Sequence, residues 1–424
     1  MKPSSTRGIV WGSALFLLVV TVAGTVGGSA PQAVVGIHGD HVVPVMAYAP
    51  PKTLPGSVFV SSPPSGAKGP DDITYLSTPS LDWGRPLVWT AYQNGINPNG
   101  TPGTPGGPTN STVVGYDPAL GVLVKSISVP GKVDGLTADP AHDRLIATVN
   151  EDDNSGINVI SPGSGTVTRY NYAPNPAVSG NGGTDSIAIW NGLIYTTHSN
   201  PNDTTQAAEY LVTLHPTTRV AQLTPIFSDN SWATARGPTM VRLALTDPDT
   251  NAVMPTVSPR FAGDLATVSQ ADGKVIFAHS FGAGVWLHEL NLTDNVSGNL
   301  PPIDGFAVAT SAHGTLYVVD GSSGTITALS TTGWPAGTVF VGEPSDNGNP
   351  LIGTLNLFSG KISPLGNHFV SPKGILFVPD HMTGSPGDHA DRGHLGGHAD
   401  APLTRTIGGT ALASMRLGAA RVTA

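Results

Sequence analysis

A two-strand phrase recurs along this chain and restricts its possible folds more than any other feature. Each copy opens on an Asp, enters an apolar segment, turns at polar residues and enters a second apolar segment. The matched second-segment position follows the Asp by 13 residues in three copies, from Asp134 to Ala147, Asp264 to Phe277 and Asp304 to Tyr317. Variants begin at Asp72 and Asp185, and a last copy at 368–380 lacks the leading Asp. Such regular repetition predicts a ring or stack of like units.

A second hairpin follows several of these copies. Its two apolar segments are joined by a polar residue and a Pro, at 113–124, 157–168, 210–221 and 243–254. Pro presets the turn, and the β-branched residues on either side suit short pleated strands. Two hairpins per unit make four antiparallel strands in about 40 to 50 residues, which is the size of a propeller blade.

The spacing of the copies predicts the number of blades. Six second-segment positions are matched, at Trp89, Ala147, Tyr195, Phe277, Tyr317 and Phe377. The gap of 82 residues between Tyr195 and Phe277 predicts one further, degenerate blade at 229–258. We therefore expect an all-β fold, a seven-bladed β-propeller of four-stranded antiparallel blades. The segment 338–361 resembles an additional strand pair, and six or eight blades are the alternatives. A pair of β-sandwiches is disfavoured because no linker-like composition divides 56–380.

Composition supports this class and excludes others. Gly (53) and Pro (38) make up about a fifth of the 424 residues, against an ordinary share of about 12%. Only 12% of the residues are charged, too few for the surfaces of a helical protein. The net charge of −9 without a basic run excludes nucleic-acid backbone binding. The absence of Cys excludes disulfides and thiolate chemistry.

The two ends of the chain differ in composition from its middle. Residues 1–33 combine an early Lys and Arg, an apolar stretch and small residues, which is typical of a secretory signal peptide. An uncleaved anchor is the alternative. We expect an N-terminal extension at 34–55. The propeller then begins at 56, and its first strand, at 57–60, closes the ring. The propeller ends at 380, and 381–424 is a disordered, His/Asp/Gly-rich and then weakly basic tail. The protein is thus expected outside the cytoplasm, secreted or in the cell envelope, as a monomer.

The second strands carry a family resemblance. The segments YVVD (317–320), YTTH (195–198), FAHS (277–280) and FVPD (377–380) resemble the Tyr-Val-Thr-Asn repeat of extracytoplasmic propellers. The layout of 56–380 is similar to that superfamily, which includes NHL, virginiamycin-lyase-like and gluconolactonase-like propellers. The resemblance implies the fold, whereas these proteins include lyases, lactonases and binding modules. The early Glu-Gly-Pro-type metal ligand of gluconolactonases has no counterpart here, nor is there a residue match to the lyases.

The leading Asp residues form the first candidate site. If the first strand of each blade lines the channel, the repeated carboxylates gather near one of its mouths. Oxygen ligands in that arrangement suit Ca²⁺. The alternative is structural, because an Asp that follows the repeat can accept backbone hydrogen bonds in its turn. The predicted metal set is Asp72, Asp134, Asp185, Asp264 and Asp304.

The ends of the second strands form another candidate site, because the residue there differs from copy to copy. His198 and Asp320 are predicted as catalytic acid–base groups, and Tyr92, Asn150 and His279 as ligand-binding groups. The alternative is that these side chains cap loops. In the tail, His389, His394 and His398 are weak candidates for Zn²⁺, Cu²⁺ or Ni²⁺.

Two classes of function follow. The first is a secreted propeller that binds a small molecule or an extracellular protein or polysaccharide. The alternative is a metal-assisted hydrolase or lyase, lactonase-like, with its site at the mouth of the central channel. No nucleic acid is expected as a partner, and a membrane only through an uncleaved N-terminal segment.

Overall fold

The computed structural model of the chain describes ten stretches, and all statements below concern these residues. They are 34–38, 41–45, 53–77, 85–173, 182–201, 206–235, 237–281, 284–293, 300–345 and 350–380. The predicted signal segment and C-terminal tail lie outside them. Strands β1 (Val34–His38) and β2 (His41–Val45) form a two-stranded sheet of their own.

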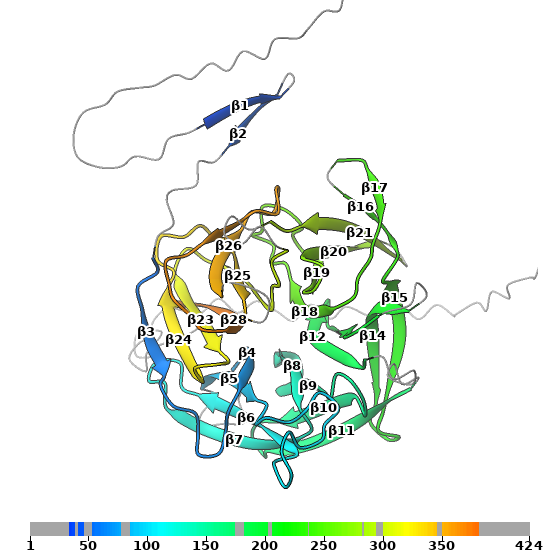
Figure 1. Cartoon of the computed structure of the whole chain (residues 1–424), viewed down its shortest axis with the longest axis vertical. Helices are drawn as coiled ribbons and strands as arrows, with labels where there is room; N and C mark the ends of the chain where they lie inside the picture. Colours follow the sequence, from blue (N-terminus) through cyan, green and yellow to red (C-terminus); the bar gives the residue numbers. More distant parts are fainter. Residues whose placement is uncertain are drawn as a thin grey trace, which may run out of the picture.

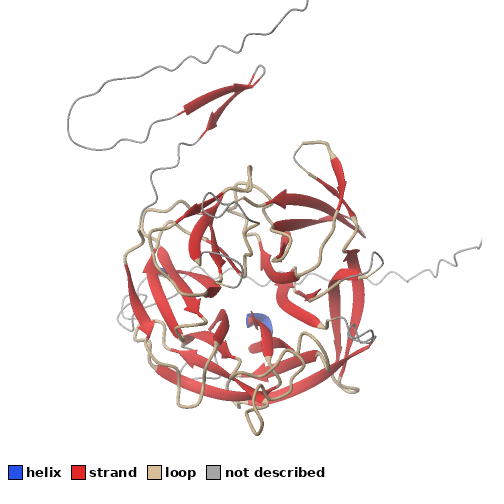
Figure 2. Ribbon diagram, viewed as in Figure 1, coloured by secondary structure: helices blue, strands red, loops and turns tan. Residues whose placement is uncertain are grey.

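The described chain forms a closed ring of β-sheets around a central axis (Figure 1). The structure is almost entirely strand, with one short 3₁₀ helix, η1 (Pro140–His142), among the described residues (Figure 2). Six groups of four antiparallel strands, which we call blades 1 to 6, make up the ring. Their innermost strands contact each other in the order β4, β8, β12, β18, β22 and β28, and β28 contacts β4 again. The fold is therefore a β-propeller.

Blades 1 to 3 follow the chain in simple order, from the axis outward. Their strands are, for blade 1, β4 (Pro70–Ser77), β5 (Pro86–Tyr92), β6 (Asn110–Tyr116) and β7 (Leu123–Pro130), for blade 2, β8 (Val133–Asp139), β9 (Arg144–Val149), β10 (Gly156–Ser161) and β11 (Thr166–Ala173), and for blade 3, β12 (Thr184–Trp190), β13 (Leu193–His198), β14 (Ala207–His215) and β15 (Val220–Ser228). The outer strands β11 and β15 pair in parallel, which joins blades 2 and 3 into one sheet. Asn191 and Gly192 both adopt positive φ, 52° and 76°, as the tight turn between β12 and β13 requires.

Blade 4 carries an additional hairpin at its outer edge. Its strands are β18 (Pro248–Val253), β19 (Leu265–Ser269), β20 (Lys274–Phe281) and β21 (Gly284–Asn291). The hairpin of β16 (Trp232–Thr234) and β17 (Met240–Arg242) joins β21 through the pairing of Thr234 with His288.

Blades 5 and 6 are interleaved along the chain. Blade 5 consists of β22 (Gly305–Val308), β25 (Val339–Glu343), β26 (Leu351–Leu355) and β27 (Ile362–Pro364), and blade 6 of β28 (Pro372–Pro379), β23 (Gly314–Asp320), β24 (Thr325–Ser330) and β3 (Gly56–Val60). The chain thus leaves blade 5 after one strand, builds a hairpin of blade 6, returns for three strands of blade 5, and ends in blade 6. The phrase 304–320 is therefore not a hairpin, because its two strands belong to different blades.

The blade count of seven is not confirmed, since the described strands form six blades. The segment 229–258, expected to be a degenerate blade, contains the added hairpin and the inner strand of blade 4. The hairpin expected at 243–254 is wrong, because Pro248 begins β18 there, a strand position that Pro tolerates. The strand pair at 338–361 is present as β25 and β26 within blade 5. The closing strand is confirmed, since β3 pairs with β24.

The hydrophobic core is divided among the six interfaces between neighbouring blades. Between blades 1 and 2, for example, Trp89 and Ile127 pack with Leu136 and Leu145, all fully or nearly fully buried. Equivalent clusters fill the other five interfaces. The blades consequently pack face to face and leave their innermost strands around the axis. Among the described residues, no helix has the length and apolar character to span a bilayer.

Candidate functional site: the central channel and its acidic chamber

The inner strands begin at the same end of the channel, and each begins with an ionisable side chain. In five of them an Asp lies among the first residues of the strand or directly before it, and in β28 Lys373 has this place. A chamber of about 150 Å³ lies between these residues. It is lined by polar and charged residues throughout, and eight of them are acidic: Asp71, Asp72, Asp134, Glu151, Asp185, Asp247, Asp249 and Asp304.

Glycines let the inner strands approach closely around this chamber. A Cβ on Gly135 of β8 would collide with the carbonyl oxygen of Asp185 on β12. In the same way, a Cβ on Gly305 would meet the carbonyl oxygen of Lys373, and one on Gly374 that of Asp71. Only Gly fits at such positions. The ring is thereby narrow at the level where the carboxylates gather.

Lys132 neutralises one side of the chamber. Its ammonium group lies 2.6 Å from Asp134 Oδ1 and also binds Glu151. Burial opposes the charge on Lys132, but the neighbouring carboxylates of Asp134 and Glu151 raise its pKa well above the usual value. The backbone amide of Glu151 donates to Asp134 Oδ2 at 3.1 Å. Lys132 therefore stays charged and is held by two acidic groups.

Lys373 occupies an equivalent position on the other side. Its ammonium group lies 3.1 Å from Asp71 Oδ1 and 3.2 Å from Asp304 Oδ2. These two carboxylates raise the pKa of Lys373 well above its usual value. Asp71 also accepts a hydrogen bond of 2.6 Å from Gln93 Nε2. Two lysines thus pair with four of the eight acidic residues.

The remaining carboxylates have few or no partners of this kind. Asp72 Oδ2 accepts a hydrogen bond of 2.7 Å from the amide of Leu136. The carboxylates of Asp185 and Asp249 have neither a hydrogen bond nor an ion pair with any described residue, although Asp185 is only 5% exposed. Buried carboxylates without partners are costly to keep charged. The chamber therefore carries an excess of acidic groups over cationic ones.

Burial and mutual repulsion shift the acidity of these groups in one direction. Burial is the largest cause that raises the pKa of Asp185 well above its usual value, and the charge of Asp249 adds to it. Burial, with Asp304 and Asp247, raises the pKa of Asp249 likewise. The pKa of Asp247 rises to about 6 for the same reasons. The pKa values of Asp72 and Asp134 are also raised, first by burial.

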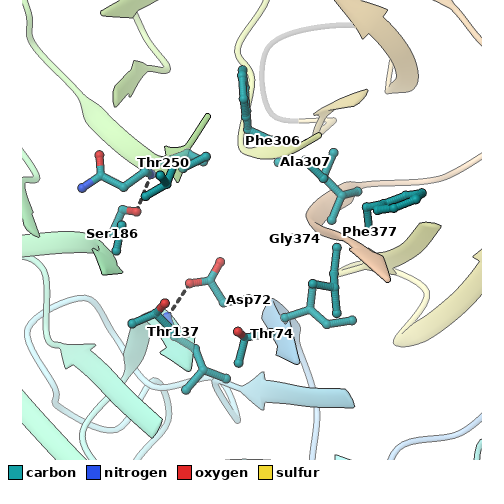
Figure 3. A pocket seen from close by; sticks show the side chains of 18 of the residues that line it. Asp72, Thr74, Thr137, Ser186, Thr250, Phe306, Ala307, Gly374 and Phe377 are labelled. Atoms are coloured by element: carbon teal, nitrogen blue, oxygen red, sulfur yellow. Dashed lines mark hydrogen bonds between the residues drawn. The ribbon is translucent and has the colours of Figure 1, made fainter. Parts of the chain in front are cut away.

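A second cavity of about 330 Å³ continues along the axis, lined by the later residues of the inner strands. Asp72 and Asp304 line both cavities, so the two meet at these residues. Figure 3 shows Asp72 pointing into this channel, with Thr74, Thr137 and Phe377 around it. Apolar side chains such as Ile187, Phe306 and Leu376 form much of its wall. The channel wall thus combines apolar side chains with polar ones such as Thr74, Ser186 and Asn251, and one end of the channel is acidic.

The structure brings together four members of the predicted metal set. Asp72, Asp134, Asp185 and Asp304 line the chamber, whereas Asp264 does not. Asp264 precedes β19, which is the second strand of blade 4, and its carboxylate lies 2.7 Å from His279 Nδ1. The place expected for it belongs to Asp249. Within the described stretches, no three His, Asp or Glu side chains are grouped so that they could hold one metal ion.

The predicted catalytic groups are not brought together. His198 is 1% exposed in blade 3, where its ring packs edge-on against Tyr210. Asp320 lies in blade 6 and accepts hydrogen bonds from the amides of Ser323, Val370 and Ser371. Neither residue lines the chamber. The loop-capping alternative describes Asp320 well.

The predicted ligand-binding groups also lie apart. The Tyr92 hydroxyl is buried against the Tyr116 hydroxyl at 2.7 Å. Asn150 adopts a positive φ of 63° and accepts a hydrogen bond of 2.9 Å from the amide of Lys132. His279 is largely exposed and pairs with Asp264. His389, His394 and His398 lie outside the described residues.

Sequence reasoning missed several chamber residues. The sequence pattern places Asp247 and Asp249 in a turn and Glu151 in an acidic loop at 150–154, for which a solvated turn is favoured over a Ca²⁺ loop, and it gives Lys132 and Lys373 no role in a site. A signal for Lys373 is visible in the sequence, because Lys373-Gly374-Ile375 aligns with Asp134-Gly135-Leu136. The inner strand β28 thus carries a Lys at the position of the leading Asp, and the prediction of Phe377 on a second strand is wrong, because Phe377 lies on this inner strand.

Comparison with known proteins yields similarity of fold only. No family model matches the sequence, and no curated protein does. Similar solved structures include a streptogramin B lyase, at 15% identity over 74% of each chain with a TM-score of 0.39. Others are the periplasmic gluconolactonase of Pseudomonas aeruginosa (11% identity, 72% of this chain and 88% of that one, TM-score 0.41) and a catalytically inactive virginiamycin B lyase of Staphylococcus aureus with quinupristin (12%, 76% and 77%, 0.38).

The resemblance to lyase and gluconolactonase proteins therefore holds at the level of the fold. At these identities and TM-scores it carries no conclusion about the ligand or reaction of this chain. A function has to be argued from the channel itself.

Proposed function

We propose that this protein is a small-molecule-binding propeller that holds its ligand in the central channel. The observation that carries the proposal is the cavity of about 330 Å³ on the axis, which is lined by side chains from all six inner strands. Its volume falls within the usual range of small-molecule sites, about 300 to 1,000 Å³. A wall that combines apolar side chains with several polar groups is also compatible with such a site.

The channel wall indicates the shape of the ligand. Apolar surface along the axis comes from four residues of the inner strands, Ile73, Ile187, Phe306 and Leu376. Burial of an apolar body against them would stabilise the complex by about 25 cal/mol for each Å² removed from water. The ligand is therefore a compact molecule with an apolar part of a few carbons in length. We further propose that the protein binds it outside the cytoplasm, on the strength of the N-terminal segment 1–33.

A channel-filling substitution tests this proposal. Thr137 lines the channel on β8, and Thr137→Phe would place a larger side chain in the channel. The matched control is Thr213→Phe, at an exposed position on β14, the third strand of blade 3. Binding of the probes hexan-1-ol and hexylammonium is measured by NMR chemical-shift titration.

The expected result is measurable binding of at least one probe to the unmodified protein and to Thr213→Phe. Thr137→Phe should weaken that binding about tenfold or more, because steric overlap removes the room for the apolar body. Equal binding to both variants, or no binding of either probe to the unmodified protein, would show that the channel is not a ligand site.

A second candidate is a hydrolase or lyase that acts at the chamber. One observation favours it, the pKa of Asp247, raised to about 6 by burial and neighbouring carboxylates. A carboxyl group with that pKa gains and loses a proton near neutral pH, as general acid–base catalysis requires. Hydrolysis of a small δ-lactone, followed in the protein and in Asp247→Asn, tests this candidate. Activity that is lost in the variant supports it, and the absence of turnover in the unmodified protein rejects it.

A further inference from the structure

We propose that the group recognised at the acidic end of the channel is an organic cation, a primary ammonium or a guanidinium carried on an apolar body. This inference rests on the proposed function, since it names the class of ligand that the channel takes. It is carried by the juxtaposition of a channel whose wall is partly apolar with a chamber in which buried carboxylates outnumber cations.

The charges in the chamber are unbalanced. Eight acidic residues line it, against two lysines. Lys132 is engaged by Asp134 and Glu151, and Lys373 by Asp71 and Asp304. No described cation is paired with Asp185 or Asp249. An added positive charge would therefore find carboxylates that no other group satisfies.

The buried carboxylate of Asp185 is a second, independent observation in favour of a cation. Its residue is 5% exposed, it lines the chamber, and its carboxylate has no hydrogen-bond or ion-pair partner among the described residues. Native proteins rarely leave a buried carboxylate without a partner. A ligand ammonium or guanidinium supplies several N–H donors, and a hydrogen bond to an ionised carboxylate is about twice as strong as one between neutral groups.

The shape of the site favours an organic cation over a bare metal ion or an anion. The described carboxylates are spread around the ring and do not group in threes within reach of one ion. An anion would meet eight acidic residues, and the two lysines are already paired with four of these. The channel meets the chamber at Asp72 and Asp304, so a single molecule can place its cation among the carboxylates and its apolar body against the apolar side chains of the channel wall.

A series of six-carbon probes separates the cation from the apolar body. Hexylammonium, hexan-1-ol and hexanoate have similar length and differ in the charge of one end. Their dissociation constants are measured for the full chain, for Asp185→Asn, and for the control Asp153→Asn, which changes an exposed loop carboxylate. Asp249→Asn, on the neighbouring inner strand, is a second chamber variant in case Asp185→Asn does not fold. CaCl₂ is titrated as a separate probe.

We expect hexylammonium to bind about tenfold or more tightly than hexan-1-ol, and hexanoate to bind least. Asp185→Asn or Asp249→Asn should reduce the preference for hexylammonium several-fold and leave the affinity for hexan-1-ol unchanged, whereas Asp153→Asn should change neither.

Equal affinities for hexylammonium and hexan-1-ol would overturn the inference and leave the proposed function standing. Binding of neither probe would overturn both. Stoichiometric Ca²⁺ binding at the chamber, without binding of hexylammonium, would overturn the inference in favour of a metal site.

Discussion

Glu209 is a fully buried carboxyl group that connects two blades. It lies on β14 of blade 3 with 0% exposure. Asn251 Nδ2 donates to one of its oxygens at 3.0 Å, and Thr267 Oγ1 donates to the other at 2.9 Å, both from blade 4. Burial raises the pKa of Glu209 to about 8, although these hydrogen bonds act in the opposite direction. At neutral pH the group is therefore protonated in the folded chain and ionised in the unfolded chain.

This difference makes stability depend on pH. Between the ordinary pKa of 4.5 and about 8, the folded chain binds one more proton than the unfolded chain, so the free energy of unfolding falls as the pH rises. Glu209→Gln removes that dependence and keeps an oxygen that accepts from Asn251 Nδ2, while its N–H can donate to the hydroxyl oxygen of Thr267, which is able to accept as well as to donate. The difference in the free energy of unfolding between the variant and the unmodified protein should therefore rise, in favour of the variant, by about 1.4 kcal/mol for each pH unit between about pH 5 and 8.

Urea unfolding at pH 5, 6, 7 and 8 measures this gain. Parallel pH curves for Glu209→Gln and the unmodified protein would contradict the expectation.

At the scale of elements, the closing strand β3 is expected to be essential, whereas β1 and β2 are not. β3 pairs with β24 and covers its edge, and Val60 and the preceding Leu54 are buried in the core. Leu54 also exchanges two hydrogen bonds with Asn367. β1 and β2 pair only with each other.

Two truncated chains test this expectation. A chain that begins at Thr53 should unfold at nearly the same urea concentration as the full chain. A chain that begins at Ser61 should lose about 5 kcal/mol or more, because removal of buried aliphatic side chains costs about 2 to 5 kcal/mol each and an edge strand is uncovered. Equal stability of the two chains would show that β3 does not close the ring.

Much of the element order could be predicted, because each blade repeats the same apolar pattern. The hairpins at 113–124, 157–168 and 210–221 are confirmed as β6–β7, β10–β11 and β14–β15. The assignment failed where a strand lacked the expected opening. Asp249 follows a Pro and was interpreted as part of a turn, so the phrase at Asp264 was assigned to the inner strand in its place.

The interleaving of blades 5 and 6 could not be predicted from local pattern. The segments 305–308 and 314–320 have the spacing of a hairpin, yet their partners are distant in sequence. Pairing there is decided by packing between blades, in which Ala307 and Phe340 of blade 5 join Leu316 and Phe377 of blade 6 in one cluster. For the site, the repeat revealed four of the chamber carboxylates. It did not reveal their partners Lys132 and Lys373, because neither is one of the repeated Asp residues.

At the scale of the whole molecule, blades 5 and 6 should open together. The chain passes from blade 5 to blade 6 and back before it ends, so neither sheet can separate without displacement of strands of the other. We expect amides of β23, β24, β25 and β26 to exchange with solvent deuterium at one common free energy of opening, since cooperative units share one value. Native-state hydrogen exchange measures it. Much faster exchange in β23–β24 than in β25–β26 would contradict the expectation.

The last described strand has two roles that coincide in one segment. β28 forms the inner wall of blade 6 beside β4, and it supplies Lys373 to the chamber. A nascent chain that has not yet been translated past residue 379 has no complete wall around the axis and lacks this lysine. Synthesis must therefore pass residue 379 before the ring can be completed, and a polypeptide that is interrupted or clipped before β28 has no intact chamber in which to hold a ligand.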